Sequence, residues 1–165
     1  MKSTRRNAMF GLTSLLLSAC GSRLPTYRGP DVTRVVVFKN DRRMYLLHGN
    51  RALKSYDVDL GFAPVGDKRM AGDGKTPEGR YVIDRRNPRS SFHLSLGIDY
   101  PRPHDIAEAQ RLGKEPGGDI FIHGRGNLYT ALRKDWTWGC IAVTNDEMDE
   151  IYAMVKTGTE ISIHK

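Results

Sequence analysis

The feature that most constrains the fold of this chain is a series of short apolar runs, rich in β-branched residues and separated by Gly, Pro, Asn and Asp. Runs of about four to eight residues with such boundaries are typical of β-strands, whereas an amphipathic helix needs a longer pattern that repeats about every 3.6 residues. The runs predict strands over residues 34–38, 44–47, 53–60, 81–84, 92–96, 120–123, 141–143 and 160–164. Turn signals at Asn40-Asp41 and 48–50 make the first three a predicted β-meander, and a charged loop is expected over 85–91.

Helix signals occur in two other segments. A short helix is expected over 104–112, with Gly113 as its C-terminal stop. Thr144 followed three residues later by Glu147 is a capping-box pattern, and the helix after it should bury one apolar stripe. That stripe consists of Met148, Ile151, Tyr152 and Val155. The predicted fold class is therefore mainly β, a β-rich α+β arrangement with one or two helices packed on the strands.

The first residues form an export signal rather than part of the fold. A basic segment over 2–6 precedes an apolar stretch over 8–17, which is too short for a lasting membrane span. The stretch ends in Leu17-Ser18-Ala19-Cys20, which resembles a bacterial lipobox, so we expect Cys20 to carry lipid. An ordinary cleavage near Ala19 is the alternative. The expected organisation is a signal peptide over 1–19, a linker over 20–31 and one domain over 32–165.

The charge of the chain argues against nucleic-acid binding. The full chain carries a net charge of +7, and without residues 1–19 there are 23 basic and 19 acidic residues, a net charge of +4. A mild positive balance can attract an anionic wall or membrane surface, but it is not the dense basic patch of a nucleic-acid binder. We therefore expect no nucleic-acid partner.

Residues 119–143 carry the residue types that chemistry requires. One apolar run ends in His123-Gly124, and a second begins after Thr137-Trp138-Gly139-Cys140. If the two predicted strands are neighbours, the imidazole and the thiol can meet as a general base and its nucleophile. With Cys20 lipidated, Cys140 has no disulfide partner, so it is either a buried inert thiol or one kept for its chemistry. The neighbouring residues favour chemistry.

Arg125 and His93 are further candidate site residues, as contacts to the carboxylates of a substrate. An exposed arginine and a histidine on a strand surface are equally compatible with them. His93, His123 and Cys140 also have the ligand types of a zinc site. Their spacing contains no paired ligand motif, so we expect neither a metal nor another cofactor.

Several of these stretches resemble one known family. His123-Gly124 followed by Thr137-Trp138-Gly139-Cys140, together with Gly74-Lys75-Thr76-Pro77-Glu78-Gly79, resembles the signatures of the L,D-transpeptidase catalytic domain (YkuD-like) family. The stretches 92–96, 116–119 and 139–145 resemble its YafK-type branch of murein L,D-transpeptidases. The resemblance implies a β-sandwich-like catalytic domain over 32–165, no metal, and a thioester intermediate formed with peptidoglycan stem peptides.

The resemblance also implies roles for individual residues. Cys140 would be the nucleophile and His123 its base, with the Gly124 carbonyl orienting the imidazole. Backbone N–H groups around Gly139 and Cys140 would hold the oxyanion, and Thr137 would help to shape that wall.

Two positions depart from the family pattern. The histidine that the family carries before Gly-Cys is Trp138 here, and the Arg or Asn often found two residues after the cysteine is Ala142. Both positions are expected to face substrate. The departures therefore bear on the choice of acyl acceptor rather than on the base.

Three functions remain open from the sequence. The first is a cysteine transpeptidase of cell-wall remodelling, in which an amine on a second stem, or on a lipoprotein attached to peptidoglycan, resolves the thioester. The second is a hydrolase that uses the same residues with water and cuts a cross-link or a lipoprotein link. The third is a non-catalytic wall-binding lipoprotein. The expected location is the periplasm or cell envelope with a membrane anchor at Cys20, and Gly21 after it favours the outer membrane in a Gram-negative host.

Overall fold

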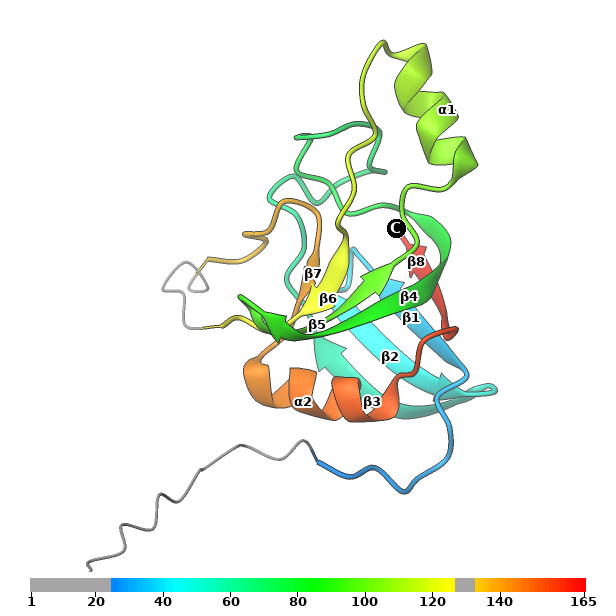
Figure 1. The fold of residues 1–165 in the computed structure, drawn as a ribbon, viewed down its shortest axis with the longest axis vertical. Helices are drawn as coiled ribbons and strands as arrows, with labels where there is room; N and C mark the ends of the chain where they lie inside the picture. Colours follow the sequence, from blue (N-terminus) through cyan, green and yellow to red (C-terminus); the bar gives the residue numbers. More distant parts are fainter. Residues whose placement is uncertain (1–24, 127–132) are drawn as a thin grey trace, which may run out of the picture.

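The computed structural model describes residues 25–126 and 133–165, in which eight strands and two helices surround one core (Figure 1). The predicted signal peptide and Cys20 lie outside the described residues. The elements are, in chain order, β1 (Arg34–Phe38), β2 (Arg43–His48), β3 (Arg51–Asp57), β4 (Gly79–Ser90), β5 (His93–Ile98), α1 (Pro103–Arg111), β6 (Phe121–His123), β7 (Ile141–Ala142), α2 (Asn145–Met154) and β8 (Glu160–His164). The strands form one mixed sheet in the order β3-β2-β1-β8-β4-β5-β6-β7. The predicted class, mainly β with one or two packed helices, is confirmed.

The first three strands form the predicted meander. β1 pairs with β2 and β2 pairs with β3, both antiparallel. The strand β8 lies between β1 and β4, parallel to β1 and antiparallel to β4. Because side chains alternate along a strand, Val35 and Val37 of β1 and Ile161 and Ile163 of β8 are buried together. β8 therefore joins the meander to the rest of the sheet.

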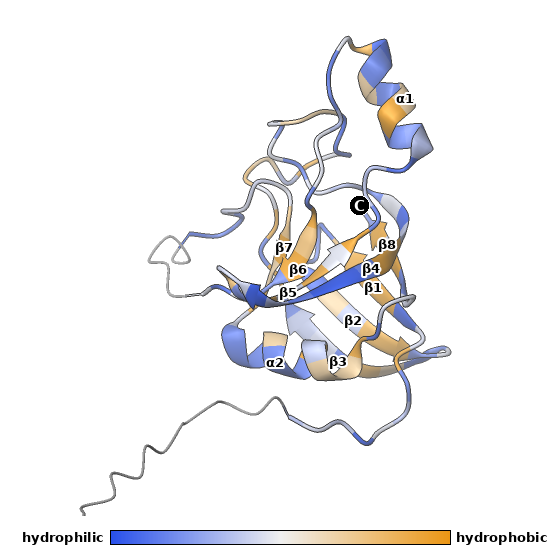
Figure 2. Cartoon of the chain, in the orientation of Figure 1, coloured by the Kyte–Doolittle hydropathy of each residue, from blue (hydrophilic) through white to orange (hydrophobic). Residues whose placement is uncertain are grey.

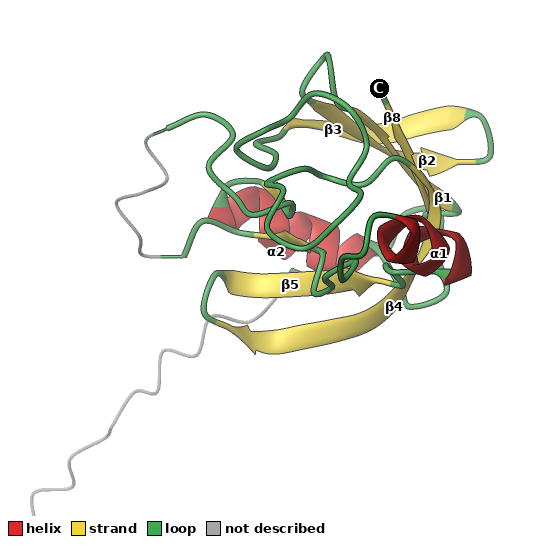
Figure 3. Ribbon diagram, turned by 90° about the horizontal axis from the view of Figure 1, so that it is seen from above, coloured by secondary structure: helices red, strands yellow, loops and turns green. Residues whose placement is uncertain are grey.

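The strand β4 bends the sheet into two layers. Residues 79–82 pair with β8, and from Ile83 onward the strand pairs with β5. Seen from above, β4 and β5 lie across from the layer that contains β1, β2, β3 and β8 (Figure 3). The charged loop expected over 85–91 is wrong, because the chain continues as β4 to Ser90. Backbone pairing with β5 holds this segment extended although its side chains are polar and partly exposed.

The core fills the space between the two layers. It is built mainly from Val, Ile, Leu and Met side chains of the sheet, and hydrophobic residues accordingly gather in the central strands, while β4 is hydrophilic over much of its length (Figure 2). Fully burying one such side chain contributes about 1.5–3 kcal/mol. The core is therefore large enough to hold short strands such as β6 and β7 in place.

Helix α2 begins at the predicted capping box. The Glu147 N–H donates to the Thr144 hydroxyl (3.3 Å), and the Thr144 N–H donates to the Glu147 carboxylate (2.9 Å). The helix packs against β5, and the four residues of the predicted stripe are all buried, together with Met154, which the stripe did not include. The four are Met148, Ile151, Tyr152 and Val155. Helix α1 instead lies at one end of the molecule (Figure 1), and no described helix is long and apolar enough to cross a membrane.

Backbone hydrogen bonds close the sheet at the end that carries Cys140. The Asp59 N–H donates to the Ala142 carbonyl (2.9 Å), and the Ala142 N–H donates to the Asp59 carbonyl (2.8 Å). Two further bonds extend this pairing, from the Thr137 N–H to the Leu60 carbonyl (3.1 Å) and from the Phe62 N–H to the Thr137 carbonyl (2.9 Å). The chain that follows β3 thus lies directly beside the turn that leads into β7.

A buried lysine anchors the long loop over 61–78. Lys39, which follows β1, is 1% exposed, and its ammonium donates to the Gly66 carbonyl (2.6 Å), the Thr76 carbonyl (2.8 Å) and the Glu78 carboxylate (2.9 Å). A buried ammonium is tolerated only when its protons have acceptors, and here three are present. The loop is therefore fixed to the sheet near both of its ends.

We predict that Lys39→Met destabilises the protein by about 2–3 kcal/mol, because three acceptors lose their donor and one of them is a carboxylate. Urea unfolding followed by circular dichroism measures this difference. The matched control is Lys54→Met, which breaks the exposed Lys54–Glu150 pair (3.1 Å) and should change the free energy of unfolding by less than about 1 kcal/mol. Equal effects of the two substitutions would contradict the anchoring role of Lys39.

Candidate active site

The structure places His123 and Cys140 on adjacent strands. His123 is the last residue of β6, and Cys140 immediately precedes β7, which pairs in parallel with β6 in the register Ile122 to Ile141. Both side chains line one pocket of about 450 Å³. The other lining residues come from β4, β5, the turn between them and the start of β6: Asn87, Arg89, Ser90, Ser91, Phe92, Ser95, Asp119 and Phe121. A thiol and an imidazole therefore share one open cavity.

The imidazole of His123 is held in a single orientation. Its Nδ1 lies 2.6 Å from the Gly124 carbonyl oxygen, and its ring is flanked by Phe92 (4.6 Å between centroids) and Trp136 (5.7 Å). Because a carbonyl can only accept, Nδ1 carries the proton and the neutral ring keeps its lone pair on Nε2. Burial lowers the pKa of His123, which favours the neutral ring that is able to accept a proton.

The thiol of Cys140 is also neutral at rest. It is partly exposed, and its Sγ lies 3.5 Å from the Asp119 carbonyl oxygen. Burial raises the pKa of Cys140 to about 11; the Phe121 backbone and the Lys68 charge oppose this rise, while the Asp119 charge adds to it. A neutral thiol beside a neutral imidazole requires that proton transfer accompany the attack of sulfur on a substrate.

The turn that carries Cys140 is fixed by Thr137. The Thr137 hydroxyl donates to the Cys140 carbonyl (2.7 Å) and accepts from the Gly139 N–H (3.1 Å). Gly139 has φ +125°, and a Cβ there would lie 2.5 Å from the Lys75 carbonyl oxygen, so only glycine fits. The Gly139 N–H was expected to help hold an oxyanion. This expectation needs correction, because the Gly139 N–H already donates its hydrogen bond to the Thr137 hydroxyl. The Cys140 N–H donates to no group in the part of the chain that the structure describes.

Arg125 belongs to a network that fixes the chain after His123. Its guanidinium donates to Asp59 (2.7 Å), which makes it part of the closure of the sheet rather than a lining residue of the pocket. Asn145, at the start of α2, accepts from the Arg125 N–H (2.9 Å) and the Gly126 N–H (3.0 Å). A Cβ on Gly124 would lie 2.7 Å from this Asn145 oxygen. Asn145 is not identifiable as a site residue from the sequence, because an asparagine there is an ordinary first residue of a capped helix.

Two other candidate residues lie differently from the expectation. The His93 Nε2 lies 2.7 Å from the Asp149 carboxylate of α2, and His93 does not line the pocket. Ala142 is fully buried between β6 and the Asp59 segment, so the expectation that it faces substrate is wrong. Trp138 does face solvent: it is 71% exposed, and its ring meets that of Phe62 edge to face at 4.8 Å. Within residues 25–126 and 133–165, no cluster of three His, Cys, Asp or Glu residues could hold a metal.

The family of the chain follows from a comparison with known domains. A model described as the L,D-transpeptidase catalytic domain matches residues 32–163. The chain belongs to this family. The resemblance in its sequence motifs is thereby confirmed, and the two-layered sheet is the fold of the family.

Individual relatives agree with this result. YafK of Escherichia coli (strain K12), named as an L,D-transpeptidase, is 29% identical over 128 residues, which cover 73% of this chain and 46% of YafK. YkuD of Bacillus licheniformis, named in the same way, is 28% identical over 147 residues, covering 85% of this chain and 72% of YkuD. The crystal structure of the helical cell shape determining protein Pgp2 from Campylobacter jejuni gives a TM-score of 0.63 at 26% identity, covering 87% of this chain and 51% of Pgp2. The chain thus spans about half the length of YafK and Pgp2.

We predict that alkylation of Cys140 by iodoacetamide accelerates about tenfold per pH unit between pH 7 and pH 9 and reaches no plateau in that range. The reason is that the thiolate fraction grows in this way at any pH well below a pKa of about 11. Mass spectrometry of the peptide that contains Cys140 measures the rate separately from alkylation at Cys20. A plateau near neutral pH would instead show a preformed thiolate–imidazolium pair.

Proposed function

We propose that the protein is a cysteine L,D-transpeptidase that acts on peptidoglycan stem peptides through a thioester acyl-enzyme. The observation that carries this proposal is that the thiol of Cys140 and the imidazole of His123 share one pocket, with the imidazole proton held on Nδ1 by Gly124. Membership of the L,D-transpeptidase family supports peptidoglycan as the substrate, and similarity to a protein that determines helical cell shape supports a role in wall remodelling.

The first half of the reaction forms the thioester. Nε2 of His123 takes the proton from Sγ of Cys140 while the sulfur attacks the amide carbonyl carbon of the stem peptide. The Cys140 N–H, which has no acceptor among the described residues, donates to the oxyanion of the tetrahedral intermediate. When the intermediate collapses, the carbon–nitrogen bond breaks, and the imidazolium returns its proton to the departing amine.

The second half resolves the thioester. A new amine enters the pocket and loses a proton to Nε2 of His123 as its nitrogen attacks the thioester carbon. The carbon–sulfur bond then breaks, and the imidazolium gives the proton to the sulfur, which restores the thiol of Cys140. The end of β4 and the turn after it line the pocket, and the exposed Arg89 of β4 is suited to a carboxylate of the stem.

A hydrolase with the same residues is the second candidate. Water would then take the place of the amine, and a cross-link or a link between peptidoglycan and a lipoprotein would be cut. The observation that favours this candidate is the exposed indole of Trp138, two residues before Cys140 in the sequence, at the position where the family carries a histidine. The face of an indole ring has no lone pair that could accept a hydrogen bond from an incoming amine.

Within this proposal the protein is held at the envelope by lipid on Cys20.

We predict that Cys140→Ala and His123→Ala each lower turnover by about a thousandfold or more, because one removes the nucleophile and the other its base. The full chain is incubated with tetrapeptide muropeptides and, separately, with peptidoglycan that carries attached lipoprotein, and the products are identified by mass spectrometry. Cys20→Ala and His48→Ala are the matched controls and should keep full activity in solution. Turnover by Cys140→Ala at the wild-type rate would exclude the catalytic proposal and leave a wall-binding lipoprotein.

We predict that Trp138→His changes the ratio of transfer to hydrolysis more than about threefold, while total turnover changes less. The imidazole restores a hydrogen-bonding group beside the thioester without touching His123 or Cys140. Products are counted at increasing concentrations of an added amine acceptor. Phe62→Leu is the control, because it removes the ring against which Trp138 packs but adds no hydrogen-bonding group. An unchanged ratio in Trp138→His would show that this position does not select the acceptor.

A further inference from the structure

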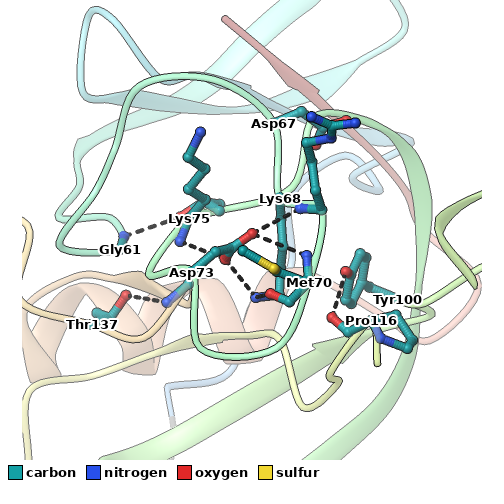
Figure 4. Close-up of polar contacts among 12 residues, drawn as sticks. Gly61, Asp67, Lys68, Met70, Asp73, Lys75, Tyr100, Pro116 and Thr137 are labelled. Carbon is teal, nitrogen blue, oxygen red and sulfur yellow. Dashed lines mark hydrogen bonds and ion pairs between the residues drawn. The ribbon is translucent and has the colours of Figure 1, made fainter. Parts of the chain in front are cut away.

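A second buried lysine lies in the loop over 61–78 and has a different environment from Lys39. Lys68 is 3% exposed, and its ammonium donates to the Asp73 carboxylate (2.9 Å) and to the Met70 carbonyl (3.0 Å). Asp73 also accepts from the backbone N–H groups of Arg69 (2.8 Å), Met70 (3.1 Å) and Lys75 (3.0 Å). Figure 4 shows this arrangement, in which the Asp73 carboxylate accepts hydrogen bonds from several residues of the same turn. An ion pair buried to this degree is costly unless further hydrogen bonds satisfy its groups; here Lys68 has two acceptors and the Asp73 carboxylate has four donors.

The turn held by Asp73 forms the wall behind the nucleophile. The Lys75 N–H is bound to Asp73, and the Lys75 carbonyl oxygen lies 2.5 Å from the point that a Cβ of Gly139 would occupy. The backbone of Lys75 therefore packs against the residue that precedes Cys140. A shift of this turn by a fraction of an ångström would move the peptide that carries the Cys140 N–H.

The same turn also contacts the segment on the other side of the thiol. The Ala71 N–H donates to the Glu115 carbonyl (2.7 Å), and a Cβ on Gly117 would lie 3.2 Å from the Ala71 Cα. That segment leads to Asp119, whose carbonyl oxygen is 3.5 Å from Sγ of Cys140. Tyr100 supports the segment by donating to the Pro116 carbonyl (2.9 Å), as drawn in Figure 4.

We propose that the Lys68–Asp73 ion pair is a positioning device for Cys140, which fixes the walls on both sides of the thiol. Its role in turnover rests on the proposed function, whereas its effect on the thiol does not. The charged groups that act on the thiol are Lys68, which favours the thiolate, and Asp119, which opposes it. His123 shares the pocket but is neutral at rest. Because the Lys68 side chain is buried, solvent screens its charge less than that of a surface lysine.

Alkylation of Cys140 in the full chain tests the proposal without a wall substrate. Iodoacetamide is the probe because it is uncharged, and mass spectrometry reports the Cys140 peptide alone. Lys68→Met should slow alkylation at pH 8 by about three- to tenfold and shift the pH profile of the rate toward higher pH. The reason is that the loss of a cation that favours the thiolate raises the pKa of a thiol. Lys68→Arg keeps the charge and should restore most of the rate. The pair Lys68→Met with Asp73→Asn is nearly isosteric and leaves no unpaired buried charge, so it provides the same test if the single variant folds poorly.

Two control variants separate positioning from general damage. Arg69→Met removes the cation next to Lys68 in the sequence. The Arg69 side chain is half exposed and paired with Glu108 (2.7 Å), so this change should leave the pH profile of Cys140 alkylation unchanged. Lys39→Met loosens the same loop without a charge near the thiol and should lower stability but not alkylation of the folded protein. An unchanged profile in Lys68→Met, or an equal displacement in Lys39→Met, would overturn the proposal.

Turnover on muropeptides provides the second readout. Lys68→Met should lower kcat by at least threefold with KM within about twofold of the wild type, because Lys68 acts on the nucleophile and does not line the substrate pocket. A fall confined to KM would overturn the positioning role. If the wild-type chain alkylates as predicted but turns over no muropeptide, the proposed function fails while the displaced alkylation profile still supports the effect of Lys68 on the thiol.

Discussion

The geometry of the site depends on the paired backbone hydrogen bonds between Asp59 and Ala142. β6 has three residues and β7 has two, and strands of this length are not stable without neighbours on both sides. The Asp59 pairing gives β7 its second neighbour, and so holds the strand that begins after Cys140 beside the strand that ends at His123. The carboxylate of the same residue binds Arg125, two residues after the histidine. One residue thus holds the strand next to Cys140 through its backbone and the segment after His123 through its side chain.

Buried charges give the irregular part of the site its rigidity. The loop over 61–78 contains no strand or helix, so no regular hydrogen-bond ladder fixes it. Lys39 supplies three hydrogen bonds at its ends, and Asp73 accepts four within it, from Lys68 and three backbone N–H groups. Removing one partner of such a pair lowers the stability of the fold strongly, because the other charge is left buried and unpaired. Replacing both partners by apolar side chains is often neutral, so the pair itself contributes little net stability. The benefit of these charges is therefore a defined position for the loop beside Cys140, more than stability of the fold.

The sequence predicts what depends on local pattern and misses what depends on long-range pairing. Alternation and capping signals correctly located the meander, β8 and α2, since burial of one face determines each of them. The segment 85–91 was misread as a loop, because only its pairing with β5 makes it a strand. The motifs identified Cys140 and His123 as candidates, but no pattern shows that Thr137 takes the Gly139 N–H or that Asn145 binds the backbone after the histidine. Those contacts join residues whose proximity only the folded chain establishes.

In the proposed mechanism, the electrostatics of the site imply that the thiolate is formed only during the attack itself. With a pKa of about 11, only about one thiol of Cys140 in ten thousand is ionised at pH 7, and burial also disfavours a charge on His123. In the proposed mechanism, charge is therefore stabilised in the transition state, by the Cys140 N–H at the oxyanion and by the buried ammonium of Lys68 at the sulfur. A small thiolate population also slows oxidation of the sulfur, since oxidants attack the thiolate. An unpaired cysteine in an oxidising compartment would gain from this protection, so the burial that limits resting reactivity is compatible with the export proposed for the chain.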